Sequence, residues 1–244
     1  MEFEVWSKTD VGLKRELNED SILVDEKLGL FVVADGMGGH EGGEVASSLA
    51  VKTCQEVIKS NDHQEGISPQ NLIRRAFEEA SHRIHHKSHV ESPELMGMGT
   101  TMVVGLLVQD QLYIGNVGDS RAYLYKEPFL WQISEDHSLV NDQIRAGVIR
   151  EEDADSVSGK NVITRSVGFE KHVEPDIFVR KVEDNEVVLL CSDGFSGLVP
   201  DKDIIKLLNE NPPPKVVSKG IQAAKKAGGD DNISIVLVRF RQPR

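Results

Sequence analysis

VVADGMGGHEGGEVAS, residues 32–47, runs from a strand-like segment through a glycine-rich turn into a helix-like segment. Apolar residues lead into Asp35, and five of the next eight residues are glycine. Glycine is favoured where the backbone turns sharply or approaches a ligand closely. The stretch lacks the third glycine of the dinucleotide fingerprint and the Gly-Lys-Ser/Thr of a phosphate-binding loop. Nucleotide binding is therefore not indicated, and the aspartate at the end of the strand is the residue to explain.

The composition is that of an acidic globular protein. The 244 residues include 28 Lys and Arg against 40 Asp and Glu, so the formal net charge is −12. This charge disfavours nucleic acid and anionic membranes as partners, because like charges repel. No apolar run approaches the ~18 residues of a membrane span, and the N-terminus lacks the basic and apolar regions of a signal peptide. Cys54 and Cys191 are predicted to be buried and reduced. We expect a cytoplasmic enzyme or binding protein.

Hydrophobic periodicity divides the chain into blocks of strands separated by helix pairs. Strands are predicted over 3–11, 21–25, 28–34, 100–108, 111–117, 121–126, 129–133, 176–182, 186–192 and 233–240. Helices are predicted over 43–58, 72–84, 201–208 and 214–227. Such blocks favour antiparallel sheets flanked by helices over alternating βαβ units. We therefore predict an α+β fold with two sheets packed face to face, and an acidic, turn-rich excursion over 138–170.

Two histidines, His85 and His86, lie near the end of the second predicted helix. This helix is amphipathic, with apolar residues at three- and four-residue steps. The helix dipole favours cations near the C-terminus, so we interpret both histidines as exposed surface residues rather than as a metal site.

Acidic residues occur at the ends of several predicted strands. They are Asp20, Asp35, Asp119, Asp193 and Asp231. Singly, an aspartate beside Gly or Asn is most often a turn former, because its carboxylate hydrogen-bonds the nearby backbone. Carboxylates that converge at strand ends, however, repel one another unless they are protonated or bridged by cations. Oxygen ligands suit Mg²⁺ or Mn²⁺, and a pair of such ions can activate water and clamp a phosphate.

Seven motifs occur along the chain in a fixed order. They are VGLKRELNED (11–20), VVADGMGGHEGGEVAS (32–47), MGTT (98–101), GNVGDSRAYLY (115–125), DHSLV (136–140), LLCSDGFSGLV (189–199) and GGDDNISIVLV (228–238). Their order and types resemble the metal-dependent protein phosphatase family, the type 2C serine/threonine phosphatases, in its compact bacterial form. The resemblance implies an αββα four-layer sandwich with two mainly antiparallel sheets flanked by helix pairs. It also implies one catalytic domain over 1–244, with a flap subdomain at about 140–168.

The resemblance assigns metal ligands. Asp35 resembles a carboxylate that bridges two metal ions, and the carbonyl of Gly36 resembles a ligand of one of them. This would explain the glycine, because backbone rather than side chain must reach the metal. Asp193 and Asp231 resemble the remaining direct ligands. Asp119, together with Asp193, resembles the holder of a third ion.

Other positions match residues around the ions. Asp20 and Glu19 match an acidic pair that orients water on the metals. Arg15 matches the phosphate-binding arginine, whose fork can hold two phosphate oxygens. His40 resembles a histidine that protonates the leaving alkoxide, and the alternative is a histidine at a helix entrance that hydrogen-bonds local backbone. Two further residues are interpreted as structural supports: Asn232 and Arg121.

The implied activity is hydrolysis of phosphoserine and phosphothreonine in proteins, by in-line attack of a hydroxide that bridges two Mn²⁺ or Mg²⁺ ions. The implied partners are the phosphorylated substrates of a serine/threonine kinase and the kinase itself, and we expect a monomer that acts in signalling. Two alternatives stay open: a metal-dependent phosphatase of small phosphorylated molecules, and a non-catalytic phosphoprotein-binding module. The predicted flap has Val157 and Ser158 where the family has His-Pro. The resemblance therefore does not predict the substrate preference of this protein.

Overall fold

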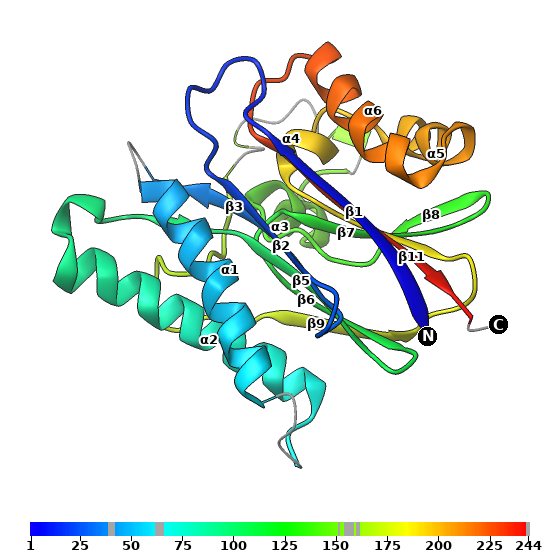
Figure 1. The fold of residues 1–244 in the computed structure, drawn as a ribbon. Helices are drawn as coiled ribbons and strands as arrows, with labels where there is room; N and C mark the ends of the chain where they lie inside the picture. The colour runs from blue at the N-terminus through cyan, green and yellow to red at the C-terminus, as the bar shows by residue number, and fades with distance from the viewer. Residues whose placement is uncertain (39–41, 62–65, 151, 154–158, 160–161, 243–244) are drawn as a thin grey trace.

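The computed structural model describes residues 1–38, 42–61, 66–150, 152–153, 159 and 162–242. At its centre two sheets pack face to face (Figure 1). In the first sheet the strands follow the order β1 (Glu2–Asp10), β11 (Ile233–Arg241), β10 (Val187–Cys191), β7 (Arg121–Lys126) and β8 (Phe129–Gln132). In the second the order is β2 (Asp20–Asp25), β3 (Leu30–Met37), β5 (Met102–Val108), β6 (Gln111–Val117) and β9 (Asp176–Lys181), with β4 (Gly99–Thr100) paired to β3. All the pairings between these strands are antiparallel.

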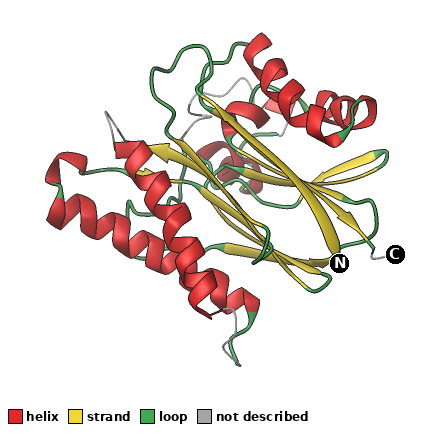
Figure 2. Ribbon diagram, in the orientation of Figure 1, coloured by secondary structure: helices red, strands yellow, loops and turns green. Residues whose placement is uncertain are grey.

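Helices cover the outer face of each sheet, which gives four layers (Figure 2). Helices α1 (Gly42–Asn61) and α2 (Pro69–His86) cover the second sheet. Helices α4 (Asp193–Ser196), α5 (Asp201–Glu210) and α6 (Pro213–Lys226) cover the first. The remaining helical segments are α3 (Leu139–Arg145), the π-helical turn η1 (Lys87–Glu91) and the 3₁₀ turn η2 (Pro93–Leu95). The predicted αββα sandwich is confirmed.

The sequence of β3 begins with an unbroken apolar run because both faces of the strand are buried. Successive side chains of a strand point to opposite faces. Leu30, Val32 and Ala34 belong to the core beneath α1 and α2. Phe31 and Val33 belong to the core between the two sheets. Both faces of this strand are therefore buried, and the polar alternation of a half-exposed strand does not arise.

Helix α2 begins with an ordinary serine cap, but its end departs from the usual pattern. Ser68 caps α2 by accepting a hydrogen bond from the Asn71 N–H, and Pro69 occupies the first helical turn. Beyond His86 the chain does not leave the helix but continues as the π-helical turn η1. The sequence did not predict η1, η2 or α4, because segments of three to five residues are too short to show a hydrophobic period.

The topology brings acidic strand ends together. Strands β10 and β11 are antiparallel neighbours, so Asp193, just after β10, lies beside Asp231, just before β11. The register of β2 and β3 places Asp20 directly opposite Asp35. These four residues belong to both sheets, so the sandwich itself gathers them at one end.

The prediction for the two cysteines holds. Cys54 and Cys191 are both buried and free. Within the described ranges, no helix has both the length and the apolar character needed to cross a membrane.

Candidate active site

Asp20 and Asp35 face each other across the β2–β3 pair. Asp20 is 7% exposed and its Oδ2 accepts a hydrogen bond from Ser192 Oγ at 2.8 Å. Burial, with the charges of Asp193 and Asp231, raises the pKa of Asp20 to about 7. Burial and the charge of Asp20 raise the pKa of Asp35 well above its ordinary value. Negative charge is therefore unfavourable at this point unless a cation or a proton balances it.

Asp119 and Asp193 bring carboxyls from two further strand ends into the same cluster. Burial raises the pKa of Asp193, and the charge of Asp231 adds to the effect. Burial and the charge of Asp193 raise the pKa of Asp119 to about 7. A hydrogen bond between Asp35 and Asp193 is among the causes that raise the pKa of Asp35. The structure thus brings together the predicted ligands Asp35, Asp193 and Asp119 with Asp20.

Asp20, Asp35, Asp119 and Asp193 form what we call the carboxyl cluster. Arg15 adds a positive charge at its rim. Its Nη2 lies 2.8 Å from Oδ2 of Asp231, and its Nη1 lies 3.9 Å from Oε2 of Glu19. About half of the Arg15 side chain is exposed (48%), so solvent reaches the guanidinium. The predicted phosphate-binding arginine is therefore held at the site by two of the predicted acidic residues.

Glycine at position 36 is required by crowding. A Cβ on Gly36 would lie 2.1 Å from the carbonyl oxygen of Gly43 and 2.6 Å from that of Glu19, which no side chain tolerates. The Gly36 N–H donates to the same Glu19 carbonyl at 3.2 Å. Crowding of three backbone segments therefore accounts for this glycine, and the sequence explanation, that the Gly36 backbone must reach a metal ion, stays a prediction.

Asn232 joins the N-terminal loop to the start of β11. It is 3% exposed, and its Oδ1 accepts from the Glu19 N–H at 2.7 Å. Its Nδ2 donates to the carbonyls of Val11 and Leu17, at 3.0 and 2.9 Å. These bonds fix both ends of the loop that carries Arg15, which agrees with a structural role for Asn232.

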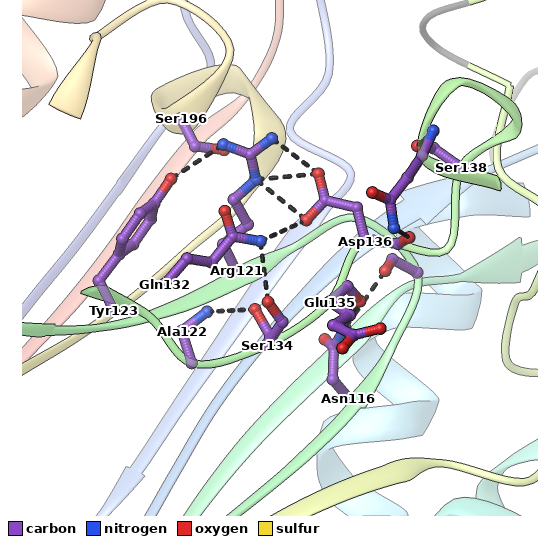
Figure 3. Close-up of polar contacts among 12 residues, drawn as sticks. Asn116, Arg121, Ala122, Tyr123, Gln132, Ser134, Glu135, Asp136, Ser138 and Ser196 are labelled. Carbon is purple, nitrogen blue, oxygen red and sulfur yellow. Dashed lines mark hydrogen bonds and ion pairs between the residues drawn. The ribbon is translucent and has the colours of Figure 1, made fainter. Parts of the chain in front are cut away.

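Arg121 and Asp136 form a bidentate pair next to the site (Figure 3). The distances from Arg121 Nε and Nη2 to Oδ2 of Asp136 are 3.0 and 2.7 Å. Nη1 of Arg121 donates to the hydroxyl of Tyr123 at 2.9 Å. Asn141 Nδ2 donates to the backbone carbonyl of Asp136 at 2.7 Å, which ties α3 to the same segment. Arg121 therefore supports the wall of the site, as its sequence context predicted.

His137 is a residue whose role the sequence did not reveal, although the motif DHSLV contains it. The side chain is 5% exposed, and its Nδ1 accepts from the Gly118 N–H at 3.1 Å. Its Nε2 lies 3.1 Å from Oδ2 of Asp176, whose other oxygen binds Arg165 at 2.9 Å. His137 thereby anchors the turn that presents Asp119.

A groove with a volume of about 790 Å³ extends from the carboxyl cluster to α3. Asp119, Asp193 and Asp231 line one part of it. Val140 and Ile144 of α3 line another, together with the Arg121–Asp136 pair. The groove can therefore take a phosphorylated side chain at the acidic part and neighbouring residues of the same ligand along α3.

The donor set fits hard divalent cations. Its side-chain atoms are carboxylate oxygens, the ligands that Mg²⁺ and Mn²⁺ prefer. Within the described part of the chain, Oδ1 of Asp20 and Oδ1 of Asp193 are buried without a hydrogen-bond partner. No three His, Cys, Asp or Glu side chains of that part are already arranged to hold a metal ion. Arg15 Nη2 contacts Oδ2 of Asp231 at 2.8 Å, so ligation by that oxygen requires the guanidinium to move away.

Two sequence predictions fall on residues that the structure does not describe. His40, the predicted proton donor, lies outside the described residues. So do Val157 and Ser158, where the sequence departs from the family pattern.

Solved structures share this sandwich and identify its class. The Mycobacterium tuberculosis serine/threonine phosphatase PstP/Ppp superposes with a TM-score of 0.91 at 32% identity, over 98% of this chain and 99% of that one. A structure of the catalytic domain of PstP in complex with two manganese ions gives a TM-score of 0.87 at 31% identity, over 98% and 99% of the two chains. The fold is thus that of metal-dependent phosphatases.

Sequence comparison identifies the family. Residues 8–233 match the family described as Protein phosphatase 2C, and the chain belongs to this family. The serine/threonine phosphatase stp of Listeria monocytogenes is 38% identical over 241 residues, which cover 95% of this chain and 93% of the relative. The predicted family membership is confirmed.

Proposed function

We propose that this chain is a serine/threonine protein phosphatase that hydrolyses phosphoserine and phosphothreonine in proteins with the help of divalent cations. The observation that carries the proposal is the cluster of one buried carboxyl, Asp20, and three half-buried ones, Asp35, Asp119 and Asp193, all with raised pKa values, beside the exposed Arg15. A phosphate monoester carries a charge of about −1.5 to −2 near pH 7. It can approach such an acidic cluster only when cations lie between the two.

Asp35, the Gly36 carbonyl, Asp193 and Asp231 would hold two cations, and Asp119 with Asp193 would hold a third. When bound, the cations supply a nucleophile from water near neutral pH and neutralise charge on the phosphate. Manganese is the first ion to test, because the related PstP structure contains two manganese ions, and magnesium has the same preference for oxygen ligands. The third ion is supported by the pKa of Asp119, which burial and the charge of Asp193 raise to about 7.

Residues of the chain itself would position the substrate. Arg15 would leave Asp231 and place its guanidinium fork on two phosphate oxygens, since Asp231 is needed for a cation. Asp20 and Glu19 would lie behind the cations and orient water. His40 is kept as the proposed donor of a proton to the leaving alkoxide.

The substrate class follows from the groove. Its extension along α3 gives room for the residues that flank a phosphorylated side chain, which favours proteins over small phosphorylated molecules. A non-catalytic binding module would not need the full set of predicted metal-ligand aspartates, all of which the sequence contains.

The proposal includes the partner and the setting. The chain would act on the products of a serine/threonine kinase and on the kinase itself. Phosphoproteins form where ATP is available, which supports action in the cytoplasm. A monomer is supported by the helices that already cover the outer faces of both sheets.

The activity can be tested by phosphate release from a phosphothreonine peptide, a phosphotyrosine peptide and an aryl phosphate, each with Mn²⁺ and with excess chelator. We expect turnover of the phosphothreonine peptide with Mn²⁺, its loss in chelator and its return when Mn²⁺ is added back, because the carboxyl cluster needs cations to admit phosphate. Full activity in excess chelator would exclude the cation mechanism. Faster turnover of the aryl phosphate than of any phosphopeptide would favour the small-molecule alternative.

Arg15→Ala is expected to raise KM for the phosphothreonine peptide about tenfold, with a smaller effect on kcat. A charge-assisted hydrogen bond contributes on the order of 1.5–3 kcal/mol, and Arg15 would contact the phosphate in the bound substrate as well as in the transition state. Arg15→Lys is the matched control, because it keeps the charge and loses the fork. A collapse of kcat with unchanged KM would show that Arg15 acts in the transition state alone.

A further inference from the structure

A groove between α1 and α2 lies outside the site described above. Its volume is about 690 Å³. Val45 and Leu49 of α1 line one side, and His82 and His86 of α2 line the other. The two helices lie side by side, and the end of α2 adjoins the start of α1 (Figure 1). The groove therefore combines two apolar side chains and a pair of imidazoles with charged residues of both signs: Glu44, Glu79, Glu91, Lys52, Arg83 and Lys87.

The spacing of the two histidines suits a metal ion. His82 and His86 are four residues apart in a helix, so they project from the same face. Their ring centroids are 6.3 Å apart, and the ring planes meet at 30°. Two histidines at this spacing on one helix are the arrangement with which zinc metalloproteases hold their ion.

Glu91 orients one of the two rings. The π-helical turn η1 carries Glu91 back toward α2, where its Oε1 lies 3.3 Å from Nδ1 of His86 and its Oε2 lies 3.6 Å from Nζ of Lys87. This contact uses Nδ1 of His86 and leaves Nε2 for another partner. Histidines that bind metals generally donate their second ring nitrogen to a carboxylate or carbonyl in this way.

We propose that His82 and His86 bind a transition-metal ion of the Zn²⁺ or Cu²⁺ type in the α1–α2 groove. Imidazole nitrogens suit these ions, and Mn²⁺ stands at the weak end of the affinity series for divalent ions. The groove is therefore expected to prefer Zn²⁺ or Cu²⁺, whereas the carboxyl cluster is expected to prefer Mg²⁺ or Mn²⁺. Nitrogen-to-zinc distances are about 2.0–2.1 Å, so binding requires the two rings to turn a nitrogen each toward a common point. The two histidines would supply two ligands, and water would fill the remaining positions, because no group of three His, Cys, Asp or Glu side chains in the described residues could hold an ion.

A second histidine pair on the same helix provides a matched control. His85 and His89 are also four residues apart, but their rings are stacked at 3.8 Å with planes at 11°. Nδ1 of His89 lies 2.9 Å from the carbonyl of His85 and 3.0 Å from Oγ of Ser88. At this separation the nearly parallel rings leave no room for an ion between their nitrogens, whereas the His82 and His86 rings are 6.3 Å apart and inclined at 30°. The sequence interpretation considered His85 and His86 alone and missed the pairing, because Glu91 reaches His86 only through the unpredicted η1.

The test is calorimetric titration of the full chain with Cu²⁺ and with Zn²⁺, in excess Mg²⁺ so that the carboxyl cluster is occupied. We expect His82→Ala and His86→Ala to weaken one binding event at least tenfold, and Glu91→Gln to weaken it about tenfold, the loss that removal of an orienting partner brings. His85→Ala and His89→Ala should leave this event unchanged. Electron paramagnetic resonance of the Cu²⁺ complex should show two coupled nitrogens in the wild type.

Each result bears on the proposal. Equal losses in the control pair, or no loss in His82→Ala and His86→Ala, would overturn it. Circular dichroism of each variant separates loss of ligands from loss of helix. These readouts do not depend on phosphatase activity, so failure here and failure of the proposed function remain distinct.

Discussion

Asp35→Asn should lower kcat at saturating Mn²⁺ by about a thousandfold, the upper end of what removal of one electrostatic group costs an enzyme. Asp35 belongs to β3, and the charges of Asp20, Asp193 and Asp119 all act on it, so its carboxylate lies among the residues proposed to hold the cations. An amide keeps the volume of the side chain but carries no charge, and one of its two polar ends is a donor that cannot bind a cation. The measurement is steady-state turnover of a phosphothreonine peptide across a range of Mn²⁺ concentrations.

The same substitution should not unfold the protein. Removing one negative charge from a buried carboxyl cluster relieves repulsion, so the melting temperature in chelator should be unchanged or raised. Asp110→Asn is a suitable control, because Asp110 lies in the turn between β5 and β6, at the far end of β6 from Asp119, and is exposed with Lys181 as its partner. Near-wild-type turnover of Asp35→Asn at saturating Mn²⁺, or a lowered melting temperature, would contradict the assigned role.

The metal-free protein should lose stability as the pH rises from about 4 to 7. Burial raises the pKa of Asp20 and of Asp119 from the ordinary 3.8 to about 7 in the folded state. Between these values the folded chain binds more protons than the unfolded chain, so the free energy of unfolding falls as the pH rises. This stabilisation of the folded state is fully present below 3.8, the ordinary pKa that applies to the unfolded chain. It is lost as the pH rises through about 7, the pKa of Asp20 and Asp119 in the folded chain. A shift of this size in one group corresponds to roughly 4 kcal/mol.

Urea unfolding at pH 5 and pH 8, in chelator and in saturating Mn²⁺, measures this effect. In chelator we expect the lower midpoint at pH 8, and Mn²⁺ should raise that midpoint because bound cations replace the protons. Asp20→Asn should flatten the pH dependence in chelator. A midpoint in chelator that rises from pH 5 to pH 8 would show that the carboxyl cluster does not retain protons on folding.

The sequence predicted the acidic ends of β3 and β10 because the pattern at each is local: an apolar run, an aspartate and a glycine. Asp35 and Asp193 could be placed at the ends of buried strands for this reason. We inferred from sheet packing that the acidic strand ends converge. The antiparallel pairing of β10 with β11, which brings Asp193 close to Asp231, agrees with this inference. A local sequence pattern is therefore enough to place an aspartate at the end of a buried strand.

Contacts between distant residues could not be predicted in this way. The pair Arg15–Asp231 joins residues 216 positions apart, and neither local sequence indicates the other as a partner. His137 likewise depends on Gly118 and Asp176, which reach it from different strands. Crowding at Gly36 depends on where the Gly43 carbonyl lies after folding. These contacts form only when distant segments come together in the folded protein. A pattern within one short stretch of sequence therefore does not predict them.

The first and last strands of the chain pair along their whole length, from Glu2 opposite Arg241 to Asp10 opposite Ile233. Asn232, one residue before β11, also fixes the loop that carries Arg15. A chain is synthesised from its N-terminus, so β11 is made after the other strands of the sandwich. The loop with Arg15 therefore gains its bonds to Asn232 only after those strands have been made. The placement of Arg15 thus depends on two segments, β1 and β11, that are synthesised at different times and then pair.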